Sequence, residues 1–94
     1  MKTFKASRMS GGNKLFPSEI ILDSKGVTLK TPGFFGGKET TIPYSKIASV
    51  KIDCPLLGFS SIIIQTIGED EISVFGFFKE EVKEMKEFIL NKIE

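Results

Sequence analysis

Hydrophobic and polar residues alternate along most of the chain before residue 76, and this two-residue period predicts short β-strands. The strands are predicted at residues 2–7, 19–23, 27–31, 38–42, 47–52, 59–67 and 71–75. Turn-forming residues separate most of them, and strands joined in this way form an antiparallel meander. The pattern therefore predicts seven short strands.

Three local features refine this prediction. After a turn that begins at Pro43, residues 47–52 alternate, so Ala48, Val50 and Ile52 are expected to share one face. Gly26 ends a tight turn and is expected to supply the positive φ that such turns require. The consecutive isoleucines at 62–64 indicate a strand that is either covered on both faces or locally kinked.

The hydrophobic period changes after residue 77 to the spacing of an α-helix. One apolar stripe is formed by Phe78, Val82, Met85, Ile89 and Ile93. Two acids in the first turn, Glu80 and Glu81, suit the positive end of the helix dipole. Because an apolar stripe must be covered, a helix at 78–93 is predicted to cap a bent sheet or partly open barrel.

Four segments together resemble the bacterial pleckstrin-homology-like domains. They are the hairpin at 20–27, the turn and strand at 42–50, the strand at 62–64 and the closing helix. The resemblance covers about residues 15–93 and rests on the order and spacing of these segments. It implies an α+β, mostly β fold, in which a seven-stranded antiparallel bent sheet or partly open barrel is capped by one C-terminal amphipathic helix.

The resemblance also implies a non-catalytic binding module for lipid headgroups or for proteins. Members that bind phosphoinositides place several Lys and Arg residues around the first hairpin loop. The comparable turn here has Lys25 and little else, and Glu39 lies between the lysines that flank the next loop. Many bacterial members look like self-assembling modules, so the resemblance favours protein–protein contacts.

Composition and charge place few further limits on function. The chain has 94 residues and a net charge of +1, which indicates one domain, 1–94, and no general affinity for nucleic acid. Residues 1–18 carry four basic residues and no acid, whereas residues 69–94 carry eight acids and four lysines. These two ends either meet, within one molecule or between subunits, or form separate solvated faces.

Neither catalysis nor a cofactor is expected from the residue types present. The chain has no His and only one Cys, Cys54, so the usual general bases, nucleophile pairs and Cys/His metal sites are missing. The acidic turn at 69–71 is interpreted as a solvated hairpin tip rather than a cation site. A lone Cys and the lack of an apolar run behind the N-terminal lysines fit a cytoplasmic protein.

The remaining aromatic residues and Cys54 are interpreted as structural. Phe77 and Phe78 are predicted to pack inside, with Gly76 forming the turn before the helix. Tyr44 is expected to pack its ring beneath the turn while its hydroxyl stays in water. Cys54 is expected to be a small buried apolar side chain at a strand end.

The loop at 33–37 contains the most prominent candidate contact residues, Phe34 and Phe35. Adjacent Phe residues flanked by glycines do not easily both turn inward, and exposed large apolar groups often mark binding sites. The loop is therefore interpreted as a contact with a protein or a membrane. The alternative interpretation is that it folds back and one Phe caps the barrel.

The basic N-terminal segment, 1–14, is the second candidate, either as an edge strand or as an arm. An edge strand offers unpaired backbone groups and is a natural site of self-association. We therefore expect a protein-binding homo-oligomer. The alternative function is peripheral binding to anionic membrane lipids, with Phe34 and Phe35 inserted among the headgroups and charge supplied by Lys2, Lys5, Arg8, Lys14 and Lys30.

Overall fold

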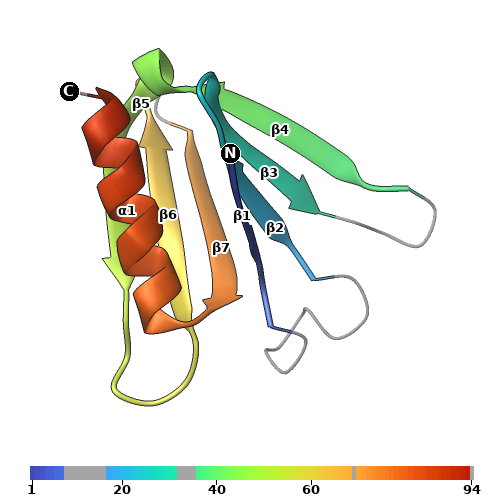
Figure 1. Ribbon diagram of the computed structural model, residues 1–94, viewed down its shortest axis with the longest axis vertical. Coiled ribbons are helices and arrows are strands. Elements are labelled where there is room, and N and C mark those ends of the chain that lie inside the picture. The colour runs from blue at the N-terminus through green and yellow to red at the C-terminus, as the bar shows by residue number, and fades with distance from the viewer. Residues whose placement is uncertain (8–16, 32–35, 69, 94) are drawn as a thin grey trace.

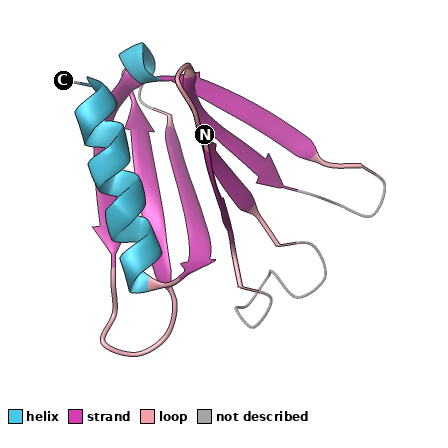
Figure 2. Cartoon of the chain, viewed as in Figure 1, coloured by secondary structure: helices cyan, strands magenta, loops and turns pink. Residues whose placement is uncertain are grey.

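The computed structural model describes residues 1–7, 17–31, 36–68 and 70–93, which form two antiparallel sheets and one helix (Figures 1 and 2). The four-stranded sheet contains β1 (Lys2–Lys5), β2 (Glu19–Leu22), β3 (Gly26–Thr31) and β4 (Lys38–Pro43). A 3₁₀ helix, η1 (Tyr44–Lys46), leads into the three-stranded sheet, which contains β5 (Ile47–Asp53), β6 (Ser60–Thr66) and β7 (Glu71–Phe77). The chain ends in α1 (Lys79–Ile93).

This arrangement confirms the predicted fold class. Seven antiparallel strands and one C-terminal helix make a mostly β, α+β domain, and strand order within each sheet follows the sequence. The described strands do not form a closed barrel, because β4 and β5 belong to different sheets joined by η1. The two sheets enclose the core, and α1 packs mainly against β5 and β6 (Figure 1).

The four-stranded sheet keeps a regular register throughout, from Lys2 opposite Leu22 to Thr31 opposite Lys38. Gly26 opens β3 opposite Pro43, and its φ is not positive, so the conformational prediction for this glycine is wrong. A Cβ at Gly26 would lie 2.3 Å from the carbonyl oxygen of Ile42. Glycine is needed here because β4 passes too close for any side chain.

The three-stranded sheet contains two register shifts, one between Ile47 and Ser49 and one between Ser60 and Ser61. An extra residue in one strand reverses the alternation of side chains beyond it. Ile47 and Val50 are therefore both buried, so the simple alternation predicted for residues 47–52 is interrupted at Ala48.

The isoleucine run in β6 is explained by ordinary alternation. Ile62 and Ile64 are almost fully buried, whereas Ile63 is half-buried on the outer face. Lys51 and Ser73 flank Ile63 from the neighbouring strands. Neither predicted alternative, cover on both faces or a local kink, is observed among the described residues, because β6 keeps a regular register from Ser61 to Gln65 and alternates inward and outward side chains.

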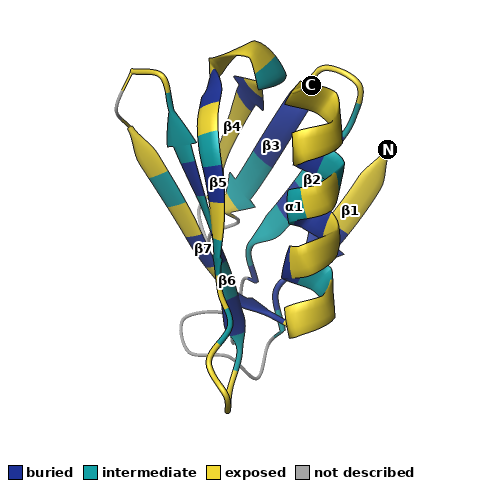
Figure 3. Cartoon of the chain, turned by 90° about the vertical axis from the view of Figure 1, so that its left-hand side faces the viewer, coloured by how far each residue is buried: buried dark blue, intermediate teal, exposed yellow. Residues whose placement is uncertain are grey.

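Helix α1 buries the middle of the predicted stripe, with Val82, Met85 and Ile89 fully enclosed. The prediction that Phe78 is a core residue is wrong: α1 starts one residue later, and Phe78 is 59% exposed. Its backbone N–H donates to Oε1 of Glu81 at 2.9 Å, which satisfies a donor at the helix start. Figure 3 shows that the exposed residues of α1 lie on the side away from the sheets.

The beginning of the described chain is joined to its end. The Ser7 N–H donates to the carbonyl oxygen of Gly76 at 2.8 Å, so the segment after β1 contacts the C-terminal end of β7. Lys2 on β1 also forms an ion pair with Glu84 on α1. The basic and acidic ends predicted from the sequence therefore meet, at this pair, within one molecule.

Candidate interaction surfaces

Four of the predicted contact residues, Phe34, Phe35, Arg8 and Lys14, lie outside the described residues. The other three, Lys2, Lys5 and Lys30, are described and lie on strands of the four-stranded sheet. Each has an acidic neighbour: Lys2 pairs with Glu84, Lys5 with Glu19 at 3.3 Å, and Lys30 with Glu39 at 3.5 Å. Because these pairs are largely solvent-exposed, they contribute little to stability, but they reduce the free positive charge available to an anionic surface.

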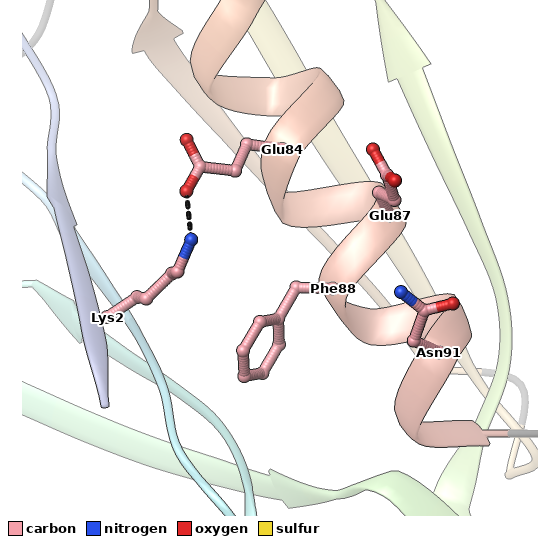
Figure 4. Close-up of a pocket in the computed structure, with 5 residues that line it drawn as sticks. All are labelled: Lys2, Glu84, Glu87, Phe88 and Asn91. Atoms are coloured by element: carbon pink, nitrogen blue, oxygen red, sulfur yellow. Dashed lines mark hydrogen bonds and ion pairs between the residues drawn. The ribbon is translucent and has the colours of Figure 1, made fainter.

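A hollow of about 310 Å³ lies beside Lys2, between β1 and α1 (Figure 4). Its lining consists of Lys2, Glu84, Glu87, Phe88 and Asn91. The Phe88 ring points into the space between helix and strand, and Lys92 lies 5.6 Å from its centroid. The lining combines one ring with three charged groups, two of which are paired with each other.

A second hollow of about 310 Å³ is lined by Lys30, Gly37, Lys38 and Glu39. It lies at the end of the hairpin formed by β3 and β4, where the Lys30–Glu39 ion pair spans the two strands. Each hollow has charged side chains in its lining.

The outer edge of β4 is the longest free backbone edge of the four-stranded sheet. Among the described residues β4 pairs only with β3, and all its residues except Ile42 are exposed. The Thr41 side chain is tied back to Thr28 by a hydroxyl–hydroxyl hydrogen bond of 2.8 Å. The other edge strand, β1, is obstructed by the Ser7–Gly76 backbone bond and by the Lys2–Glu84 pair.

The side chains of Asp23 and Tyr44 form hydrogen bonds that order the turn between β2 and β3 and join it to η1, directly after β4. Backbone N–H groups of Lys25 and then Gly26 donate to Oδ1 of Asp23, at 2.8 and 3.1 Å, and hold the Asp23 pKa below its ordinary value. The Tyr44 hydroxyl donates to the Asp23 carbonyl oxygen at 2.5 Å. Burial, and then the Asp23 charge, raise the pKa of Tyr44. The hydroxyl is thus bonded to backbone, not left to water as predicted.

A group of apolar side chains lies at one end of the three-stranded sheet, and we call it the apolar end. It consists of the exposed Leu56, Leu57, Phe75 and Phe78 and of the half-buried Phe59. Leu56 and Leu57 are 101% and 89% exposed in the loop between β5 and β6. Behind them the Phe59 ring lies 6.2 Å from that of Phe75 and 5.8 Å from that of Phe78.

The bulge in β7 turns Phe77 into the core and leaves Phe78 outside. Gly76 has a φ of +118° at the register shift, which glycine adopts without strain. The extra residue places Phe77 fully in the core, as predicted, and leaves Phe75 and Phe78 outside. Gly76 therefore forms a bulge within the strand and not the predicted turn.

Sequence reasoning missed the apolar end, since residues 55–58 look like an ordinary turn. The signal in the sequence is the Leu pair between Pro55 and Gly58, because a loop so short cannot fold back to bury both. Cys54, next to this loop, is only half-buried and packs against the edge of the core. Its predicted position at a strand end is confirmed, whereas full burial is not.

Across residues 1–7, 17–31, 36–68 and 70–93, no cluster of three or more His, Cys, Asp or Glu side chains is arranged to hold a metal ion. The same residues include no helix with the length and apolar character needed to cross a bilayer. Models of known protein families give no match to this chain, and neither do curated proteins. The pleckstrin-homology-like resemblance stays a prediction based on the order of the elements.

Proposed function

We propose that this chain is a non-catalytic, cytoplasmic interaction module of the pleckstrin-homology-like type that binds protein, and that it self-associates through β4. The observation that supports the proposal is the exposed six-residue edge of β4, which pairs only with β3 among the described residues. Such an edge presents a row of backbone donors and acceptors, and a second copy can add a strand to it.

The sequence of β4 favours one antiparallel register with itself. A two-fold axis perpendicular to the sheet keeps side chains on their own faces, so only registers centred on a residue are allowed. Centring on Glu39 opposes two carboxylates, and centring on Thr41 brings Pro43, which has no N–H, into the ladder. Centring on Thr40 opposes Thr40 with Thr40 of the partner subunit, without like charges.

Charge placed at Thr40 tests this register. Light scattering is expected to give twice the 10.4 kDa chain mass for the wild type and a monomer for Thr40→Lys, because two ammonium groups would meet at the axis. Mixing Thr40→Lys with Thr40→Glu should restore the dimer. Thr3→Lys is the matched control, since Thr3 is an exposed threonine on β1, and it should leave the dimer intact.

Two results would overturn the proposal. One is a monomeric wild type at high protein concentration. The other is a dimer that survives Thr40→Lys and dissociates in Thr3→Lys, because that pattern would place the contact at β1.

Peripheral binding to anionic lipids through the basic residues is less well supported. Lys2, Lys5 and Lys30 each have a carboxylate within ion-pair distance, so little unpaired charge is left on these three side chains. Affinity of this kind depends on uncompensated charge and falls with added salt. A salt-dependent affinity for anionic vesicles, lost on neutralising Lys2, Lys5 and Lys30, would support it instead.

A further inference from the structure

The apolar end projects from the molecule as a hairpin tip without charge. The loop between β5 and β6 extends beyond the first turn of α1 (Figures 1 and 3). No charged residue occurs from Cys54 to Gly68, and the charges that flank the segments 56–59 and 75–78 in sequence are Asp53, Glu69, Glu71 and Lys79, mainly acidic. A charged partner surface therefore has little to recognise here, whereas apolar contact is available at Leu56 and Leu57.

The size and shape of the apolar end limit what can cover it. Four exposed side chains and one half-buried ring make an apolar patch on the order of a few hundred Å², below the ~800 Å² per partner of a standard protein interface. A second copy would need a recess to receive the projecting leucines. The two hollows described above each have charged side chains in their lining.

We propose that the apolar end inserts into the interfacial region of a lipid bilayer. Leu56 and Leu57 enter the boundary between headgroups and acyl chains, and the Phe59, Phe75 and Phe78 rings lie behind them. Because the loop that carries Leu56 and Leu57 is uncharged and the flanking charges are mainly acidic, the binding is driven by apolar burial, not by attraction to anionic lipids, and it depends weakly on salt. This inference does not rest on self-association through β4.

The experiment uses a single tryptophan as a reporter, since the chain has none. In Leu57→Trp, emission should shift to the blue and be quenched by brominated acyl chains when phosphatidylcholine vesicles are added. Ile67→Trp is the matched control, because Ile67 is 62% exposed at the turn after β6, the opposite end of that strand from the tip. It should show neither change.

Sedimentation with the same vesicles then measures the partition of tryptophan-free protein. Leu56→Ser/Leu57→Ser should weaken partition at least about tenfold, whereas Ile67→Ser should leave it unchanged. Adding about 1 M salt, where the Debye length is about 3 Å, should change wild-type partition less than twofold. Circular dichroism checks that the variants are folded, which is expected because the substituted loop is exposed.

Three results would overturn the inference. The first is no partition of the wild type into vesicles with or without phosphatidylglycerol. The second is partition that disappears at high salt, which would indicate an electrostatic contact. The third is a wild-type dimer that becomes monomeric in Leu56→Ser/Leu57→Ser, which would make a second copy the occupant.

Discussion

The two sheets present different parts of the chain to solvent. The four-stranded sheet has no register shift, and its free edge at β4 offers backbone groups flanked by Thr, Lys and Glu. The three-stranded sheet has two register shifts, and the one at Gly76 turns Phe77 into the core and leaves Phe78 outside. A regular sheet thus offers main chain at its edge, whereas a bulged sheet redirects side chains and can form an apolar surface beside its own core.

The largest expected effect concerns the regular sheet. Gly26→Ala would place a Cβ 2.3 Å from the Ile42 carbonyl oxygen, so β3 and β4 must move apart. We expect a loss of about 3 kcal/mol in the free energy of unfolding, measured by chemical denaturation. Gly68→Ala is the control, since nothing lies within 4 Å of a Cβ there, and it should be close to neutral. Equal effects at both positions would contradict the close approach of β3 and β4.

A smaller effect is expected at the bulge of the other sheet. Gly76→Ala should cost about 2 kcal/mol, because its φ of +118° strains any residue that has a Cβ. Relief of that strain by a change of register would move Phe77, which is fully buried, so the core should loosen around it. Denaturation midpoints and amide exchange in β7 check this. A stability equal to wild type would show that the bulge does not need glycine.

The smallest expected effect is the pH dependence of the turn that supports β4. The Asp23 pKa is lower when folded than when unfolded, so the carboxylate stabilises the fold at neutral pH and ceases to do so as pH falls through the folded pKa. Asp23→Ala should therefore weaken the fold slightly at neutral pH and match wild type more closely in acid. Ser24→Ala is the control, and its difference from wild type should be the same at all pH values.

If instead the difference between wild type and Asp23→Ala stays constant down to about pH 2, below the usual range of Asp ionisation, the two backbone hydrogen bonds do not lower the pKa.

Periodicity predicted the elements because each strand and the helix bury one face. The alternation of Ile72 and Val74 with Ser73 in β7 and the helical spacing of Val82, Met85 and Ile89 follow that burial directly. The bulges at Ala48 and Gly76 were not predictable in the same way. A single extra residue leaves the composition unchanged but moves each side chain after it to the opposite face of the sheet.

The role of Gly26 and the exposure of Phe78 depend on contacts between distant segments. The reason for glycine at position 26 is the carbonyl oxygen of Ile42, sixteen residues away, and no local pattern encodes that distance. Phe78 fits the helical stripe, but α1 begins after it and the Phe59 ring packs beside it outside the core. The apolar end likewise joins two segments that are distant in the sequence, residues 56–59 and 75–78.

The backbone bond between Ser7 and Gly76 also has a consequence for how the chain is made. During synthesis β1 leaves the ribosome well before Gly76 does. It can therefore pair with β2 early, whereas the Ser7–Gly76 hydrogen bond forms only after β7 has been made. Contacts of such long sequence separation form late and slow folding. Until β7 and α1 emerge, the unjoined side of β1 and the basic residues on it are open to chaperones or to other nascent chains.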